Sequence, residues 1–470
     1  MKTTLTHLRI SLPQQLNVRI PAWITSVEEI AIGAGLDSSR MKILLHQLFL
    51  CYLKNSKLRR SKVGENFIPD YFPVSSTLLK QTCTDNYLKY INALIQAGVI
   101  DRRSSEYGTS SYVVGGHAQL YRWNIVDTYE GGCSFRKETV TGYKQIKSVM
   151  RTRDQFIKEC KQNAVEYSIL NPVFAQLHSY LDDVVFDPEY YKISEQHSVT
   201  SDLRFLESEA LANKDFVWFS VDKFGNRLHH PFTTIPKEYR QHLRFKDCSG
   251  TALVELDIKN SQPYFSSVIS SKRLVNEHLV EFLPLLPYIE KFDKNADFLL
   301  YRKLCVEGRL YDFLMDSLGM NSKNENDTHK IKELFFASVL FSKLRVYGKK
   351  SRFREAFKSV FPSVHAMFQT IKGLDETVLP ELKNIIRPTS KKFKYEKSND
   401  AYKLVACLMQ RSEAKVMLQI VAPRLVEAGI KFITIHDSVM VLPEHAGLAK
   451  QIIYDAFESI GLVPPTLSIK

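Results

Sequence analysis

The stretch IKFITIHDSVMVLPEH, residues 430–445, decides the fold because it has the pattern of a β-hairpin. Two apolar runs rich in β-branched residues, Ile430–Ile435 and Val439–Leu442, flank the triplet His436-Asp437-Ser438, and Pro443 ends the second run. A carboxylate at the tip of such a hairpin is held by two buried strands and stays open to a ligand, which suits a metal ion. Because one carboxylate alone holds Mg²⁺ weakly, the pattern predicts a partner for it.

A second candidate carboxylate lies in TALVELDIKNSQPYF, residues 251–265. The run Ala252–Leu256 predicts a buried strand, and Asp257 stands at its end. If they lie on adjacent strands, Asp257 and Asp437 would hold a pair of Mg²⁺ ions between them. Two metal ions in this arrangement activate a 3′-hydroxyl and stabilise a leaving pyrophosphate. Taken singly, each Asp is more often a turn residue.

These residues carry a resemblance to a known family. The segment VELDIKNSQPYF resembles motif A, and ITIHDSVMV resembles motif C, of the family A DNA polymerases and the single-subunit phage-type RNA polymerases. Upstream, Gly225 to Leu228 with Pro231, Ile235-Pro236 and Arg240 is similar to the stretch TGR…PNLQNIP that leads into motif A in that family. The resemblance covers roughly residues 220–460 and implies one right-handed palm.

Two helices between and after these segments extend the resemblance. The stretch THKIKELFFASVLFSK, residues 328–343, resembles the fingers helix called motif B, and Lys332 and Phe336 stand one turn apart in it. The resemblance implies that the ammonium meets the triphosphate while the ring stacks on the incoming base or sugar. The stretch LVACLMQRSEAKVM, residues 404–417, resembles the IQGTAAD helix of the family and supplies Gln410.

The resemblance also implies a role for each matching residue. Asp257 and Asp437 would ligate two Mg²⁺ ions, for which Mn²⁺ can substitute, and the Ile258 carbonyl would add an oxygen. Lys332 would stabilise or protonate the leaving pyrophosphate. The residues expected to bind primer, duplex or incoming nucleotide are Arg227, Ser261, Gln262, Phe336, Gln410 and His436.

Several positions depart from the family pattern. Thr328 and Leu340 replace a basic residue and a Tyr of motif B. Gln262 stands where the DNA enzymes keep a Glu that crowds a ribose 2′-hydroxyl, and Ser438 matches the RNA enzymes. Phe336 favours the DNA side, because the RNA enzymes usually carry Met there. The choice between dNTPs and rNTPs therefore stays open.

Composition describes an ordinary globular protein with a polyanionic partner. The chain has 470 residues, 44% hydrophobic and 24% charged, with a formal net charge of +13. That charge favours nucleic acid as the partner, although a basic enzyme with another substrate would also fit.

No apolar run is long enough for a transmembrane helix, and the N-terminus lacks the core of a secretory signal, so we expect a cytoplasmic protein without a membrane partner. Seven scattered cysteines without a Cys-x-x-Cys pair argue against disulfides and zinc.

The N-terminal part predicts a nucleic-acid-binding module. Asp37 is the expected N-cap of a core helix. Residues 77–82 and 86–97 predict two helices, and residues 99–103 and 119–123 predict two strands, which together outline a winged helix. Many winged helices bind protein instead. The residues expected to contact nucleic acid are Asn86, Lys89, Tyr90, Asn92, Arg102 and Arg103.

Three further basic stretches are candidates for contacts with the template or duplex. Residues 343–354 form the densest patch, with Arg345, Lys349, Lys350 and Arg352. Residues 387–397 form a second patch, and residues 141–167 predict a basic helix of a small thumb. Each stretch is equally compatible with a solvated surface.

The sequence thus predicts an α+β fold: a right-hand polymerase with an antiparallel palm sheet, helical fingers and a small thumb, preceded by a winged-helix domain. The expected parts are a winged-helix-like domain (1–130), a helical linker or thumb (131–205), palm with motif A (206–275), fingers (276–400) and palm with motif C (401–470).

The expected function is a DNA-directed DNA polymerase without proofreading exonuclease, acting on DNA template, primer and nucleoside triphosphates. One alternative is a single-subunit RNA polymerase or primase of the same fold. A second is a non-catalytic replication initiator with a palm-like scaffold. The association of a short polymerase with an initiator-like front suggests a mobile element.

Overall fold

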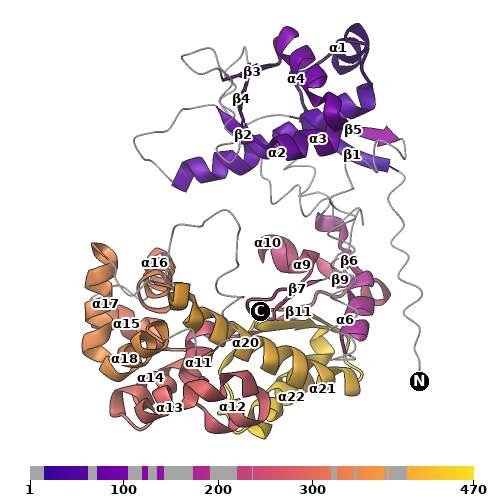
Figure 1. The fold of residues 1–470 in the computed structure, drawn as a ribbon. Helices are drawn as coiled ribbons and strands as arrows, with labels where there is room; N and C mark the ends of the chain where they lie inside the picture. The colour runs from indigo at the N-terminus through magenta and orange to yellow at the C-terminus, as the bar shows by residue number, and fades with distance from the viewer. Residues whose placement is uncertain are drawn as a thin grey trace. The chain divides into compact units, whose positions relative to one another are not determined.

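The structure is a computed structural model. It describes residues 15–61, 71–103, 119–124, 135–141, 173–190, 220–235, 237–318, 325–342, 347–374, 378–379 and 400–470. The chain forms two compact units (Figure 1). Unit 1 comprises Met1–Glu159, Phe186–Val217 and Ile235–His242, and unit 2 comprises Cys160–Val185, Trp218–Thr234 and Leu243–Lys470.

Unit 1 begins with a two-stranded antiparallel sheet and two helices. Its first elements are β1 (Gln15–Pro21), α1 (Val27–Gly33), α2 (Ser38–Ser61) and β5 (Phe135–Thr141), and β1 pairs with β5. The Asp37 carboxylate accepts a hydrogen bond of 2.7 Å from the main-chain N–H of Arg40, so Asp37 caps α2 as predicted. Buried apolar residues of the strands and helices form the core of this part.

A second part of unit 1 contains the predicted pair of helices and a small sheet. Its elements are β2 (Phe72–Val74), α3 (Ser76–Cys83), α4 (Tyr87–Gln96), β3 (Ile100–Arg102) and β4 (Gln119–Trp123), with the strand order β2-β4-β3. The Ser75 hydroxyl accepts a 3.2 Å hydrogen bond from the N–H of Leu78, and Gly98 follows α4 with a φ of +67°. The two helices and two strands between residues 74 and 125 are therefore present, and β2 is an additional strand that the sequence did not indicate.

Unit 2 contains a four-stranded antiparallel sheet in the order β11-β12-β10-β13. Its strands are β10 (Val254–Ile258), β11 (Phe432–Ile435), β12 (Ser438–Val441) and β13 (Leu467–Ile469). The hairpin of β11 and β12 and the strand β10 agree with the sequence prediction, whereas β13 was not predicted. Figure 1 shows α20 (Leu404–Val416), α21 (Ala422–Glu427) and α22 (Ala446–Ser459) close to this sheet.

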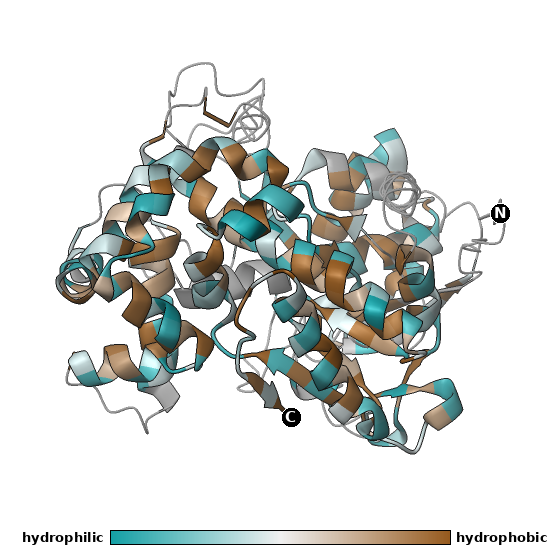
Figure 2. Ribbon diagram, turned by 90° about the horizontal axis from the view of Figure 1, so that it is seen from below, coloured by the Kyte–Doolittle hydropathy of each residue, from teal (hydrophilic) through white to brown (hydrophobic). Residues whose placement is uncertain are grey.

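A cluster of helices makes up much of the rest of unit 2. Its members are α11 (Ser261–Val268), α12 (Lys272–His278), α13 (Leu286–Ile289), α14 (Ala296–Val306), α15 (Leu310–Ser317), α16 (Glu325–Phe335), α17 (Lys349–Val360) and α18 (Pro362–Lys372). Figure 2 shows that most helices of the chain carry both apolar and polar residues. Their apolar sides supply the core, including Phe298, Phe335, Phe357 and Phe368.

Smaller elements complete the described chain: α6 (Val173–Asp182), β6 (Val184–Phe186), β7 (Ser220–Val221), β8 (Leu228–His229), α9 (Pro231–Thr234), α10 (Lys237–Arg240) and β9 (Leu243–Phe245). The mixture of helices and small antiparallel sheets agrees with the predicted α+β class. Among the helices in the described ranges, none is both long and apolar enough to cross a membrane.

Candidate active site

The two candidate metal-binding carboxylates lie on neighbouring strands. β10 pairs with β12 so that Asp257 is opposite Ser438, and Asp437 occupies the turn immediately before β12. The N–H of Ile258 donates a 3.3 Å hydrogen bond to the main-chain carbonyl of Asp437. Burial raises the pKa of Asp437 to about 8, and the negative charges of Glu413 and Asp257 add to this rise. The structure therefore brings together the two carboxylates that the sequence paired.

The turn that carries Asp437 has an uncommon backbone conformation. His436 has a φ of +54°, in the left-handed region that a residue with a side chain rarely adopts. Its ring lies edge-on to the ring of His229, with centroids 5.1 Å apart. Such conformations persist only where the surrounding structure holds them, and they are frequent at functional sites.

A third carboxylate, Glu413 on α20, lies at the centre of the site and was missed in the sequence. Its side chain is fully buried and forms an ion pair with Arg227 (Nη2 to Oε1, 2.7 Å). The Ser261 hydroxyl (2.9 Å) and the Gln262 amide nitrogen (3.0 Å) both donate to Oε2 of Glu413. Burial raises the pKa of Glu413, while the Arg227 charge and these donors oppose the rise. Three of the predicted substrate-binding residues thus converge on one carboxylate.

The hairpin of β7 and β8 presents Arg227 to Glu413. The Asp222 carboxylate accepts hydrogen bonds from the N–H groups of Gly225 (2.6 Å) and Arg227 (3.0 Å), and it contacts His229 Nε2 at 3.0 Å. Burial alone would raise the pKa of Asp222, but these bonds lower it overall. Asp222 therefore ties the two strands of the hairpin together at its turn.

The same hairpin is docked on α20 beside Gln410. A Cβ atom added to Gly225 would lie 2.6 Å from Gln410 Oε1 and 2.8 Å from Gln410 Cβ, so no side chain fits there. Arg411 donates to the main-chain carbonyls of Phe224 (3.0 Å) and Lys223 (2.8 Å). Gln410 thus packs on the hairpin that carries Arg227.

The helix predicted for residues 328–343 is present, but it is not a continuous α-helix. α16 covers Glu325–Phe335, and a π-turn, Phe336–Leu340, follows it. The π-turn accommodates one extra residue, an arrangement often found at functional sites and invisible to a periodic pattern. Leu340, at one of the positions that depart from motif B, is buried in the core.

Lys332 and Phe336 both have a neighbouring ring. The exposed ammonium of Lys332 lies 5.5 Å from the ring centroid of Tyr311. Phe336 is half-buried and stacks on Phe341, with ring centroids 5.3 Å apart and an interplanar angle of 8°. The ring predicted to meet a nucleotide thus stacks on Phe341 and also lies beside Phe335, with ring centroids 6.1 Å apart.

A cation that the sequence did not suggest lies at Asp257. The ammonium of Lys470 forms an ion pair with the Asp257 carboxylate. Lys470 extends the register of β13, because its main-chain N–H and carbonyl exchange hydrogen bonds of 3.0 Å with Glu255. The positive charge therefore stands at the end of β10, where a metal ion was predicted.

The donor set at this end of the sheet fits a dication. Asp257 and Asp437 supply hard oxygen ligands, and Mg²⁺ in such sites commonly takes one or two carboxylates and completes its shell with water and substrate phosphates. Burial is the main cause of the raised pKa of Asp437, and the repulsion from Glu413 and Asp257 that adds to it is of the kind that a bound cation relieves. No cluster of three or more His, Cys, Asp or Glu side chains suited to a metal occurs in the part of the chain that the structure describes.

The candidates for contacts with nucleic acid are mostly exposed where they are described. Lys89 and Asn92 on α4, Arg102 on β3 and the following Arg103 all reach solvent. Tyr90, in contrast, is buried, because it faces the core side of α4, so its proposed contact with nucleic acid was wrong.

The later basic stretches are only partly described. Lys350 and Arg352 are exposed on α17, Lys349 is the first residue of that helix, and Arg345 lies outside the described residues. The predicted thumb helix falls largely outside them, and the patch at 387–397 does so entirely.

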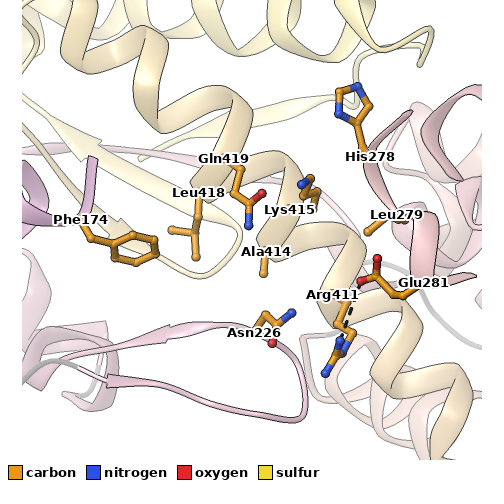
Figure 3. A pocket seen from close by; sticks show the side chains of 10 residues that line it. All are labelled: Phe174, Asn226, His278, Leu279, Glu281, Arg411, Ala414, Lys415, Leu418 and Gln419. Carbon is orange, nitrogen blue, oxygen red and sulfur yellow. Dashed lines mark ion pairs between the residues drawn. The ribbon is translucent and has the colours of Figure 1, made fainter. Parts of the chain in front are cut away.

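A small pocket is lined by residues of α20, including Arg411 and Ala414, and by Asn226 of the hairpin turn (Figure 3). Its volume of about 70 Å³ is far below the roughly 300–1,000 Å³ of typical ligand sites. Arg411 and Glu281 form an ion pair of 3.8 Å in it, and none of the predicted site residues lines it. The pocket is therefore not the predicted nucleotide site.

Comparison with known proteins finds similarity among solved structures only. No family model and no curated protein match the chain. One similar solved structure is the POL domain of Pol1 from M. smegmatis in complex with DNA primer–template and dNTP, with a TM-score of 0.37 and 13% identity. The match covers 57% of this chain and 50% of that one, so the chain spans half the length of that structure. A similarity at this level carries no weight for function.

Proposed function

We propose that the chain is a template-dependent nucleic acid polymerase, and that it is a DNA-directed DNA polymerase without proofreading exonuclease. The observation that carries this proposal is the position of Asp257 and Asp437 at one end of β10 and β12. Two carboxylates on adjacent antiparallel strands are a donor set for the ions used in phosphoryl transfer. The sequence motifs around these two residues are the reason for proposing a polymerase and not another enzyme of phosphoryl transfer.

Asp257 and Asp437 would hold Mg²⁺, or Mn²⁺ in its place, which supplies activation of a 3′-hydroxyl and neutralisation of pyrophosphate charge. Lys332 would bind the triphosphate of the incoming nucleotide. Its ammonium is exposed and has no ion pair with a carboxylate among the described residues, so a phosphate can reach it. Arg227 would act through Glu413, since its guanidinium is engaged there.

The second candidate function is a single-subunit RNA polymerase or primase. Ser438, which follows Asp437, is buried and donates a 2.8 Å hydrogen bond to Glu255, so a serine is well accommodated at this position. Gln262 has an amide at the position where the DNA enzymes that the sequence resembles have a carboxylate that crowds a ribose 2′-hydroxyl. Ser438 and Gln262 therefore both support synthesis with rNTPs as the second candidate.

The test is extension of a primer on a defined template with Mg²⁺, comparing dNTPs with rNTPs and including a reaction without primer. Asp437→Asn should abolish synthesis and leave DNA binding intact, because the amide keeps the shape of the side chain and loses the metal-binding charge. Asp316→Asn, at an exposed position on α15, is the matched control and should extend primers normally. Product with rNTPs, or without primer, would favour the second candidate. DNA binding without any product would point to a replication initiator with a palm-like scaffold.

A further inference from the structure

The strand β13 brings a cation to one of the two carboxylates of the candidate metal site. Lys470 lies opposite Glu255 of β10, and the main chains of these two residues exchange two hydrogen bonds of 3.0 Å. Two residues along β10, Asp257 lies opposite Ser468. Lys470 and Asp257 are therefore diagonal neighbours on one face of the sheet, a separation that a long side chain spans, and the ammonium forms an ion pair with the carboxylate.

This ion pair is accessible to solvent and to dissolved ions. The side chain of Asp257 is 25% exposed and that of Lys470 is 38% exposed. An ion pair in contact with water is weak, because solvent screens the charges and ordering a long lysine side chain costs entropy. A divalent ion carries twice the charge of an ammonium and prefers carboxylate oxygens as ligands. Such an ion can replace the ammonium without disturbing β13, because the hydrogen bonds between Lys470 and Glu255 come from the main chain.

The ammonium also belongs to the same group of charges as Asp437. Asp437 immediately precedes Ser438, the residue opposite Asp257, and the charge of Asp257 contributes to the raised pKa of Asp437. While Lys470 is paired with Asp257, it neutralises a charge that a divalent ion would use, and its own positive charge repels that ion. The Lys470 contact and the binding of a metal ion therefore compete for the same carboxylate.

We propose that Lys470 is a resident counter-cation of Asp257 that a divalent ion has to displace, so that Lys470 sets the affinity of the site for metal. The proposal rests on the metal site of the proposed function. Before the ion binds, the ammonium balances the charge of Asp257. Releasing the ammonium costs free energy and lowers the affinity for the ion. After release, the lysine stays beside the site, because the main chain of β13 holds it in register.

Calorimetric titration with Mn²⁺, at constant pH and without nucleic acid, tests the proposal in the wild type, Lys470→Met and Lys431→Met. Methionine keeps most of the apolar part of the lysine side chain and removes its charge. Lys431→Met is the matched control, because it also removes one positive charge and an ion pair, with Asp183 and Asp247, at the end of β11 away from the turn. We expect Lys470→Met to bind Mn²⁺ about tenfold more tightly than the wild type, and Lys431→Met to bind it as the wild type does.

Acetylation of lysines in the wild type is a second measurement, and it needs no variant. An amine held against a carboxylate is less accessible to an acetylating reagent than a free one. Mn²⁺ should therefore increase the acetylation of Lys470, measured by mass spectrometry of peptides, and leave that of Lys431 unchanged.

Equal Mn²⁺ affinity in the wild type and Lys470→Met would overturn the proposal. Acetylation of Lys470 that does not change with Mn²⁺ would overturn it as well, and so would the absence of Mn²⁺ binding in both proteins. The expected Mn²⁺ affinities together with a wild type that extends no primer would support the role of Lys470 and overturn the proposed function.

Discussion

The buried ammonium of Lys372 donates a hydrogen bond to the main-chain carbonyl of Val339, in the π-turn that follows α16. Lys372, at the end of α18, also contacts the Ser342 hydroxyl at 3.3 Å. Arg354 of α17 reaches the same turn and donates to the Ser338 carbonyl at 2.8 Å. Two cations thus meet the carboxyl end of the helix that carries Lys332, where carbonyl groups and the helix dipole favour positive charge.

Lys372 should make the stability of the protein depend on pH. Burial, and then the charge of Arg354, lowers the pKa of Lys372 to about 7 from an unfolded value near 10.5. Between these values the unfolded chain binds one proton more than the folded protein, so the free energy of unfolding rises with pH, by up to about 1.4 kcal/mol per pH unit. Below pH 7 this gain is absent.

Chemical denaturation of the wild type and Lys372→Met at pH 7, 8 and 9 measures this contribution. The free energy of unfolding of Lys372→Met should lack the increase with pH that Lys372 gives the wild type. The free energy of unfolding of the wild type should therefore increase relative to that of the variant as the pH rises. Lys358→Met, at an exposed lysine of α17, is the control and should follow the wild type. If the free energy of unfolding changes equally with pH in the wild type and in Lys372→Met, Lys372 keeps its proton in the folded protein over this pH range.

Gly225→Ala should destabilise unit 2 and impair synthesis. The added methyl group would overlap the Gln410 side chain, which has little room to move because the hairpin is docked on α20. Overpacking of this kind costs about 1–3 kcal/mol. Gly250→Ala is the matched control, since nothing lies within 4 Å of its added Cβ. Thermal unfolding measures the loss of stability, and primer extension measures the loss of synthesis. If Gly225→Ala and Gly250→Ala unfold at the same temperature and extend primers equally well, the hairpin can move enough to accommodate the added methyl group.

Lys89→Ala and Arg102→Ala should weaken DNA binding if the helices and strands of unit 1 act as a winged helix. Both side chains are exposed, and each phosphate that a variant no longer neutralises should lower the salt dependence of log K by about one. Fluorescence anisotropy with duplex DNA at several salt concentrations measures the slope. Lys303→Ala, at an exposed lysine of α14 in unit 2, is the control. Unaltered binding in Lys89→Ala and Arg102→Ala would favour a protein partner for this module.

The sequence predicted the strands at the site because their patterns are local. Alternating and β-branched runs before and after His436 specify a hairpin without knowledge of any distant residue. The run ending at Asp257 specifies β10 in the same way. The pairing of the two carboxylates came instead from the need for a second metal ligand and from the resemblance to motifs A and C, and the register that sets Asp257 opposite Ser438 agrees with it.

Glu413, β13 and the π-turn could not be predicted in this way. A glutamate within an apolar helix such as α20 shows no periodicity, and its meaning depends on Arg227, which is far away in the chain. β13 has only three residues, too few for an alternating pattern, so the ion pair of Lys470 with Asp257 was also hidden. The one signal available for Glu413 was its place one helical turn from the apolar residues Met409, Val416 and Met417, since a carboxylate on such a face is rarely buried without a cationic partner.

The order of strands in the four-stranded sheet of unit 2 has a consequence for the synthesis of the protein. β10 lies between β12 and β13, and both of these neighbours come from the last part of the chain. While the ribosome is making the helices from α11 to α21, both edges of β10 still lack their partners. Strand edges in that state are prone to pair with other chains, and pairings distant in sequence form slowly. We therefore expect chains released before residue 467 to aggregate more readily than chains that include β13.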